Sequence, residues 1–211
     1  SNKRDSRYFD LYKMKVDEWE PKIVYENKDN FSLTDISNNE NYLLLSKSVT
    51  TSENKFYLYD INKGQSKEIS IESGSYSSAG FSNDNKSFYY LTNADNEFTY
   101  LKKHNIETGE SSVVFEAKWD VMYSYMSKNE KYRVIGINED GKNTIKVINV
   151  NTKKYLDFPS FEGTDITGIV FSESENKIRL SVGSSKMPND LFVYNLEDKS
   201  LAKLTNSLNP L

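Results

Sequence analysis

The sequence predicts an all-β fold: a segment of a β-propeller with four four-stranded antiparallel blades and an N-terminal half blade. The first observation is a phrase of an apolar residue, a serine, a polar turn and an apolar strand, which occurs four times at a spacing of 45 residues. The second is that two other landmarks follow nearly the same period. The third is an aromatic content of 13%, which suits strands. A fixed period of about 40–45 residues with several strands per repeat is typical of propeller blades.

The repeated phrase begins each unit in the same way. It occurs as ISNNENYLLL, FSNDNKSFYYL, MSKNEKYRVI and FSESENKIRL, with its serine at Ser37, Ser82, Ser127 and Ser172. The polar residues after each serine indicate a turn, and the apolar run that follows indicates a buried strand.

The two other landmarks lie later in each unit. The expected third strands end at Lys15-Val16, Asp60-Ile61, Asn105-Ile106, Asn149-Val150 and Asn195-Leu196, in steps of 45, 45, 44 and 46 residues. An apolar residue of the fourth strand follows with the same steps, at Val24, Ile69, Val114, Phe158 and Leu204. Three landmarks in one register make chance similarity a poor explanation.

The N-terminal segment matches only the second half of a repeat. Residues 1–5 are polar and indicate a loop, and strands are expected at 8–16 and 22–25. These correspond to the third and fourth strands of the later units. We therefore expect residues 1–31 to form a half blade whose first and second strands lie outside these 211 residues.

Four complete blades are expected at residues 32–76, 77–121, 122–165 and 166–211. Each begins with a short strand before the landmark serine and continues with three more strands joined by polar turns. The expected strands are 33–36, 42–46, 55–61 and 67–70; then 78–81, 88–92, 99–106 and 112–115; then 123–126, 132–137, 144–150 and 155–158; and finally 168–171, 178–182, 190–196 and 202–204.

The hairpin between the third and fourth strands varies in composition. Gly64 and Gly109 stand in the first two complete blades, where glycine allows a positive φ. Lys153 and Lys199 replace it in the last two. We therefore expect a different turn type in those two blades.

Composition excludes several kinds of site. The chain has no cysteine and a single histidine, which rules out disulfides, thiolate chemistry and a multi-histidine metal site. The net charge of −4 argues against a nucleic-acid partner. No apolar run approaches the roughly 20 residues of a membrane helix. We expect no metal and no cofactor, and the composition is compatible with both cytoplasm and periplasm.

No residue qualifies as catalytic. A serine hydrolase of the α/β type needs a G-x-S-x-G elbow with an acid and a histidine placed later, and no such elbow occurs. Residues 74–78, GSYSS, lack the second glycine and fall between two blades. His104 stands beside Lys102 and Lys103, so a solvated histidine on a strand is expected.

Two other possibilities are weaker. A glycosidase needs two carboxylates held across a pocket, and Glu162, Asp165, Glu173 and Glu175 are close in sequence, but acidic residues in blade turns are usually solvated. The dipeptide Trp119-Asp120 is similar to that of WD repeats, but it lies between two blades instead of at the end of a third strand.

The first strand of each blade lines the channel of a propeller. The channel candidates lie two and three residues before each serine: Asp35, Gly80, Tyr125 and Val170, and Thr34, Ala79, Ser124 and Ile169. Small and polar members suit a water-filled channel, but packing and hairpin geometry explain them equally well. The binding residues are therefore left unassigned.

The blade phrase F-S-x-D-x-K-x-F-Y-Y-L-T-N resembles the propellers of TolB-type proteins and of the prolyl oligopeptidase family of serine peptidases. Two other phrases favour the peptidases. Residues 1–12, SNKRD followed by YFDLY, are similar to a blade of bacterial dipeptidyl aminopeptidases and acylaminoacyl-peptidases. Residues 204–210, LTNSLNP, are similar to the end of their propeller, shortly before the hydrolase domain.

The resemblance implies a peptidase in two parts. The propeller covers an α/β-hydrolase domain, filters peptide substrates by size, and carries none of the catalytic Ser, Asp and His, which would lie beyond Leu211. This chain is then expected to be inactive by itself. The alternative is a TolB-like propeller that acts as a protein-binding module. In either case the strand at 8–16 would have an unpaired edge, partly protected by Lys13 and Lys15, and self-association through it is expected.

Overall fold

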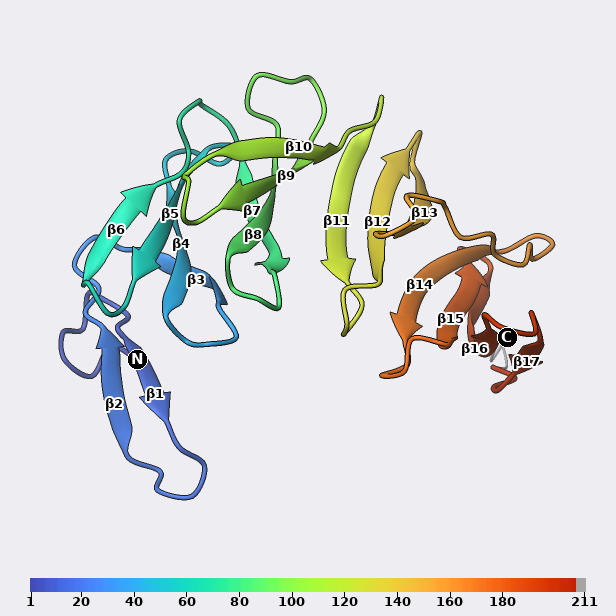
Figure 1. Cartoon of the computed structure of the whole chain (residues 1–211), viewed down its shortest axis with the longest axis horizontal. Coiled ribbons are helices and arrows are strands. Elements are labelled where there is room, and N and C mark those ends of the chain that lie inside the picture. Colours follow the sequence, from blue (N-terminus) through green and yellow to red (C-terminus); the bar gives the residue numbers. More distant parts are fainter. Residues whose placement is uncertain (208–211) are drawn as a thin grey trace. The chain divides into compact units, whose positions relative to one another are not determined.

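The computed structural model describes residues 1–207, which form two compact units, residues 1–115 and the part that begins at Glu116. Both units consist of antiparallel sheets, and no helix occurs in the described range (Figure 1). The all-β, propeller-type fold class is confirmed. Each unit is described by itself.

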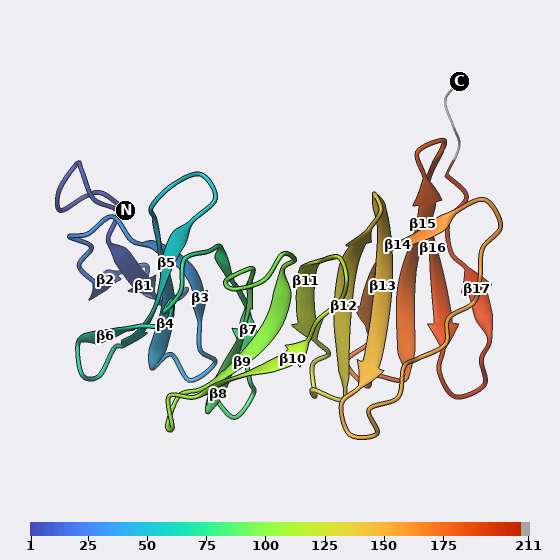
Figure 2. The same ribbon diagram turned by 90° about the horizontal axis from the view of Figure 1, so that it is seen from above.

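The first unit contains a two-stranded sheet and two four-stranded sheets (Figures 1 and 2). The small sheet pairs β1 (Leu11–Met14) with β2 (Pro21–Tyr25). The first four-stranded sheet has the order β3 (Ser32–Ile36), β4 (Tyr42–Ser48), β5 (Asn54–Asp60) and β6 (Gln65–Glu68). The second has the order β7 (Tyr76–Phe81), β8 (Ser87–Thr92), β9 (Tyr100–Asn105) and β10 (Ser111–Phe115). Consecutive strands are neighbours, as in propeller blades.

The second unit contains one three-stranded and one four-stranded sheet (Figure 1). The first is β11 (Asp120–Met126), β12 (Tyr132–Glu139) and β13 (Lys142–Asn149). The second is β14 (Asp165–Phe171), β15 (Lys177–Ser184), β16 (Met187–Asn195) and β17 (Leu201–Lys203).

The fourth strand expected at 155–158 is wrong. Only a single bridge joins Tyr155 to Ile148 on β13, followed by one hydrogen bond of 2.8 Å from the Leu156 N–H to the Val147 carbonyl. The sequence continues Asp-Phe-Pro, and aspartate and proline are both unfavourable in a ladder. Leu156 and Phe158 instead pack against the core of the second unit.

The landmark serine stabilises the same turn in every complete blade. The Ser127 hydroxyl accepts the Tyr132 N–H at 2.9 Å, and the Ser127 N–H donates to the Tyr132 carbonyl at 2.8 Å. The third residue of the turn, Glu130, has a φ of 59°. The same pairs of bonds occur at Ser37, Ser82 and Ser172. The 45-residue phrase is therefore a local hydrogen-bonding unit.

The hairpin between the third and fourth strands has the same positive-φ residue in every repeat. The different turn type expected at Lys153 and Lys199 is therefore wrong. The residue four positions after each third-strand landmark has positive φ: Trp19 53°, Gly64 64°, Gly109 75°, Lys153 59° and Lys199 61°. In the third blade the Asn149 Oδ1 accepts the N–H groups of Asn151 and Thr152 at 3.1 and 3.0 Å, which fixes the turn without glycine.

We expect Lys153→Gly to raise the free energy of unfolding by about 1 kcal/mol, because glycine adopts positive φ without the steric cost that a Cβ imposes. Gly64→Ala, at the equivalent position, is expected to lower it by a similar amount. A Cβ added at Gly64 would have open space around it, with its nearest neighbour at 3.9 Å, so only backbone strain is tested. Urea unfolding of both variants measures the effect. Changes of the same sign in the free energy of unfolding of the two variants would contradict this explanation.

Each unit has its own apolar core. In the first unit the core lies between the two four-stranded sheets and includes Leu44, Phe56, Phe88 and Tyr90. In the second it lies between the sheet of β12 and that of β15, and includes Val134, Val147, Ile178 and Leu180. The middle strands supply the most buried side chains, so the loops and turns are positioned by a rigid scaffold.

Candidate functional site

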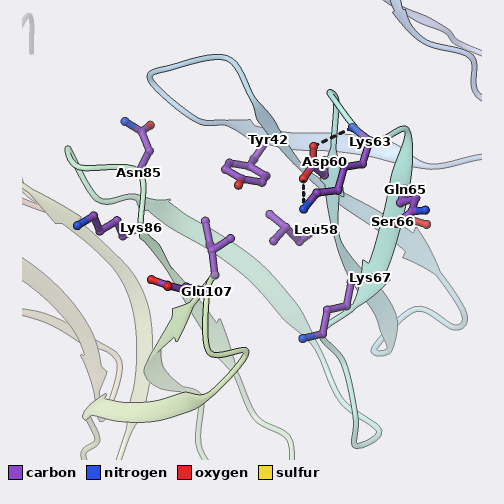
Figure 3. A pocket seen from close by; sticks show the side chains of 11 residues that line it. Tyr42, Leu58, Asp60, Lys63, Gln65, Ser66, Lys67, Asn85, Lys86 and Glu107 are labelled. Carbon is purple, nitrogen blue, oxygen red and sulfur yellow. Dashed lines mark hydrogen bonds and ion pairs between the residues drawn. The ribbon is translucent and has the colours of Figure 1, made fainter.

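A hollow within the first unit lies between its two four-stranded sheets, at the end that carries the tight turns (Figure 3). Its volume is about 560 Å³. Leu58, Ile106 and Tyr42 supply its apolar surface, and charged side chains surround them. The lining residues are Tyr42, Leu58, Asp60, Lys63, Gln65, Ser66, Lys67, Asn85, Lys86, Ile106 and Glu107.

Asp60 in this groove has a structural partner. Its Oδ1 accepts the N–H groups of Asn62 and Lys63 at 3.0 Å each, and its Oδ2 lies 3.1 Å from the Lys63 ammonium (Figure 3). Burial by itself would raise the pKa of Asp60, but the bonds from Lys63 hold that pKa below its usual value. The carboxylate therefore fixes the hairpin.

A second hollow of about 230 Å³ lies at the other end of the same pair of sheets, beside the longer loops. Three tyrosines face it, and each hydroxyl already has a partner. Tyr76 donates to the Glu72 carbonyl at 2.8 Å and Tyr100 to the Ala94 carbonyl at 3.1 Å. Burial raises the pKa of both Tyr76 and Tyr90. The Tyr76 bond fixes the segment between the two sheets, whereas the Tyr100 bond fixes a loop of the second sheet.

His104 is buried, so the expectation of a solvated histidine is wrong. The residue is 3% exposed, its ring centroid lies 4.9 Å from that of Phe88, and its Nδ1 is 2.8 Å from the Ser111 hydroxyl. Within the described residues its Nε2 is buried without a hydrogen-bond partner. Burial, with a smaller effect of Lys67, lowers the pKa of His104 to about 4.

The His104–Ser111 pair is not an activated nucleophile. A general base works best with a pKa near the operating pH, and an imidazole with a pKa of about 4 is a weak base at neutral pH. No acid orients the ring, because Nε2 has no partner in the described part of the chain. Ser111 also bonds the Tyr90 hydroxyl, so the three side chains form a structural chain.

The carboxylates at opposite ends of β14 do not form a catalytic pair. Asp165 begins β14, whereas Glu173 and Glu175 follow its other end, and seven residues of strand span about 20 Å. Glu162 precedes β14, on the side of Asp165. A glycosidase pair needs a separation of only about 5–9.5 Å. The length of β14 therefore disfavours a glycosidase pair made of one carboxylate from each end.

Glu175 is not solvated, contrary to expectation. It is buried, and its Oε1 accepts the Asn129 N–H at 2.7 Å from the turn of the preceding sheet. The first unit has an equivalent bond, from the Asn39 N–H to the Asn85 Oδ1 at 3.1 Å. In each unit a turn side chain thus connects neighbouring sheets. Glu173 is exposed, and the Lys128 ammonium 2.6 Å from it lowers its pKa.

The segment between the first two blades is held close to Asn93 and Ala94. Gly74 lies against Asn93 and Ala94, where an added Cβ would meet the Asn93 side chain at 2.9 Å. The Ser75 N–H donates to the Asn93 Oδ1 at 2.8 Å. Trp119 is exposed just before β11, and Asp120 is the first residue of that strand.

The first-strand residues mostly serve packing and local bonds. Thr34 donates to the Leu44 carbonyl at 3.0 Å, and Asp35 accepts from Ser78 of the neighbouring sheet at 2.9 Å. The Ser124 hydroxyl accepts from Arg133 at 3.0 Å, and the Tyr125 hydroxyl donates to the Ile169 carbonyl. Gly80 has a φ of 96° at the bulge of β7, while Ala79 is buried and Val170 is exposed. They do not converge on one ligand site within either unit.

Sequence reasoning missed an ion-pair network at the N-terminus, where a polar loop was expected. Arg4 makes two bonds of 2.7 Å to the fully buried carboxylate of Asp10, which also accepts the Asn27 N–H at 2.8 Å. The Arg4 guanidinium holds the pKa of Asp10 below its usual value. The repeat could have indicated this contact. Asp190 is the residue equivalent to Asp10 in the last blade, and it accepts the Ser207 N–H at 2.7 Å in the same way.

Two further classes of site are missing from residues 1–207. No group of three or more histidine, aspartate or glutamate side chains is placed to hold a metal ion in that range. The described residues also contain no helix of sufficient length and apolarity to cross a membrane.

Comparison with known proteins identifies the family. The family model described as "Prolyl oligopeptidase, N-terminal beta-propeller domain" matches residues 4–207. A comparison with curated proteins found no match.

Solved structures with a similar fold include peptidases and a TolB protein. A structure from a study of two prolyl endopeptidases has 15% identity and a TM-score of 0.73 over 93% of this chain and 33% of that one. TolB from Acinetobacter baumannii has 16% identity and a TM-score of 0.63 over 93% and 48%. A puromycin-hydrolyzing peptidase of Mycobacterium tuberculosis has 9% identity and a TM-score of 0.64 over 90% and 31%. The chain spans less than half of each of these proteins, and such identities show the fold alone.

Proposed function

Because the chain belongs to the family of prolyl oligopeptidase N-terminal β-propeller domains, we propose that it is the non-catalytic propeller portion of a prolyl-oligopeptidase-like serine peptidase. The proposal rests on the match to the family model, which extends over residues 4–207. In this proposal the peptide bond is cleaved by an α/β-hydrolase domain outside these 211 residues. The dipeptidyl aminopeptidase or acylaminoacyl-peptidase type is the subgroup that the N-terminal and C-terminal phrases favour.

The role of the propeller in this proposal is to admit peptides by size. The described structure supports a rigid scaffold for that role, since its turns are fixed by repeated side-chain bonds such as those of Ser127 and Asn149. Glu175 and Asn85 connect the turns of neighbouring sheets, which limits the opening of one sheet against the next within each unit. A filter must resist deformation by the substrates that it excludes.

We expect the 211-residue chain to hydrolyse neither chromogenic dipeptides nor acyl-amino-acid substrates. The only histidine is buried with a pKa of about 4, so it cannot activate a serine efficiently at neutral pH. Fluorophosphonate labelling followed by peptide mapping gives a second measurement, with Ser111→Ala as the matched control. Stoichiometric labelling of one serine, abolished by its replacement, would overturn the non-catalytic assignment.

The size filter is tested in the intact peptidase, the chain joined to its hydrolase domain. One cleavage site is presented in a peptide of ten residues or so and again within a long unfolded protein. A filter predicts rapid turnover of the peptide and little turnover of the long chain. Equal kcat/KM for the two substrates would contradict the gating role and leave the family assignment intact.

A TolB-like binding module is the alternative function. The similarity to the A. baumannii TolB structure favours it, although at 16% identity that similarity concerns the fold only. Such a module would act through protein contacts, and no hydrolase domain would accompany it. The groove beside Leu58 and Ile106 would then be the first surface to examine for a partner.

A further inference from the structure

The groove shown in Figure 3 is locally basic, although the chain as a whole has a net charge of −4. Lys63 and Lys67 lie on the first four-stranded sheet, and Lys86 lies in the turn between β7 and β8 of the second. Among the described residues two carboxylates line the groove, Asp60 and Glu107, and Asp60 is already paired with Lys63 at 3.1 Å. We call this hollow the lysine groove.

The walls of the lysine groove are complete. They belong to the sheets β3–β6 and β7–β10, each with all four strands in place. The lining residues lie outside β3 and β7, the first strands of these sheets. The groove is therefore separate from the channel candidates of the first strands, and no missing strand accounts for it.

The 45-residue repeat does not explain the lysines on the first sheet. The equivalent positions of the other three complete blades carry no lysine. They are Thr108, Thr152 and Asp198 for Lys63, and Ser112, Leu156 and Ala202 for Lys67. The half blade repeats one of the two, with Lys22 at the position of Lys67. The hairpins of all complete blades have the same positive φ, so folding of the turn does not require these charges.

Lys67 extends across the groove to the second sheet. A Cβ added at Gly109 would meet the Lys67 Nζ at 2.6 Å, so the ammonium lies against the hairpin between β9 and β10. After burial, its charge is the second cause of the lowered pKa of His104. Within residues 1–207 no ion pair joins Lys67 or Lys86 to a carboxylate. Two ammonium groups are therefore available to an anionic ligand.

Apolar side chains form the floor between these two ammonium groups. Leu58 is buried, and Tyr42 and Ile106 are partly buried against the core of the first unit. Figure 3 shows Tyr42 and Leu58 between Lys67 on one side and Lys86 on the other. The volume of about 560 Å³ lies within the range of ligand pockets. A matching ligand needs both an apolar group and negative charges.

We propose that the lysine groove binds an acidic peptide segment in which an apolar residue stands among carboxylates. The apolar side chain lies on Leu58 and Ile106, and the carboxylates pair with Lys67 and Lys86. Charge complementarity selects this occupant, because a purely apolar segment would bury the two ammonium groups without partners. The inference concerns a surface of the propeller itself, and it applies equally to the peptidase and to the binding module.

The test is a nuclear magnetic resonance titration of the 211-residue chain with a hexapeptide that has one leucine among glutamates. The amide signals of Leu58 and Ile106 should shift, and Lys67→Gln combined with Lys86→Gln should weaken binding roughly tenfold or more. Lys142→Gln combined with Lys186→Gln is the matched control, because it removes the same charge at two exposed positions of the second unit. Its affinity should be unchanged.

Two variant peptides separate the two parts of the site. Glutamine in place of every glutamate should abolish binding, and glycine in place of leucine should weaken it about fivefold. Equal binding of the glutamine peptide, equal effects of the two pairs of lysine substitutions, or no shift at Leu58 and Ile106 would overturn the proposal. Equal binding of the glycine peptide, or full displacement by an equal concentration of inorganic phosphate, would show a simple anion site and also overturn it. None of these outcomes bears on the fluorophosphonate labelling, so this inference and the proposed function can fail separately.

Discussion

Gly136→Ala is expected to lower the free energy of unfolding of the second unit by about 3 kcal/mol, the upper part of the range for overpacked cores. Gly136 lies in the middle of β12 and is buried, and a Cβ added there would overlap the Tyr123 ring on β11. The ring cannot move away freely because it stacks on Tyr125, with 6.2 Å between the ring centroids. The Tyr123 ring thus occupies the space that a side chain at position 136 would need.

The contact can be isolated by a double-mutant cycle and a control. In a Tyr123→Leu background the cost of Gly136→Ala should fall to below roughly 1 kcal/mol, because the clashing ring is gone. Gly168→Ala on β14 is the matched control, since its added Cβ would have only ordinary contacts at 3.8 Å. Equal costs for Gly136→Ala and Gly168→Ala in urea unfolding would show that the Tyr123 ring is not the cause.

The second large effect is a loss of stability in mild acid that comes from His104. The folded-state pKa of His104 is lowered from 6.5 to about 4, so between these values the unfolded chain binds the additional proton. The free energy of unfolding must then fall as the pH is lowered from 6.5, and we expect a loss of about 2 kcal/mol by pH 4.5. Because this is the only histidine, no other imidazole contributes.

Carboxylates act in a lower pH range and can be separated. Asp10 and Glu173 have lowered pKa values, so their contribution is present above the unfolded value near 4 and is lost below it. Between pH 4.5 and 6.5 the slope should therefore disappear in His104→Leu, which keeps an apolar side chain beside Phe88. Urea unfolding at several pH values measures this. The same slope in wild type and His104→Leu would contradict the assignment.

The sheets could be predicted from the 45-residue repeat and from the residues that form its turns. Each landmark carries its own local bonds, such as those from Ser127 to Tyr132 and from Asn149 to Thr152, so similar local sequences produce similar turns. Strand ends differed by one to three residues in most cases. The missing fourth strand at 155–158 shows where prediction from the repeat fails. Asp157 and Pro159 are unfavourable in a strand, although the repeat predicts one there.

The side-chain contacts of the candidate site were harder to predict. His104 follows two lysines, which suggests a solvated strand. Strand alternation separates it from Lys103 but leaves Lys102 on its own face, paired with Tyr90 as His104 is with Phe88. The long Lys102 side chain can reach solvent from that face, whereas the His104 ring stays buried. Glu175 is bonded by Asn129, which lies 46 residues away in the sequence. Such contacts are set by the packing of sheets, for which one sequence gives little local signal.

The reading frame after the codon for Leu211 tests the central claim most directly. If the chain is the propeller of a prolyl-oligopeptidase-like peptidase, the frame continues into an α/β-hydrolase domain with a G-x-S-x-G elbow, followed by an aspartate and then a histidine. Purification of the protein from its source and mapping of its C-terminal peptides would show whether that domain is part of the same polypeptide. A stop codon shortly after Leu211, or another blade with no hydrolase domain behind it, would contradict the peptidase assignment and favour the binding module.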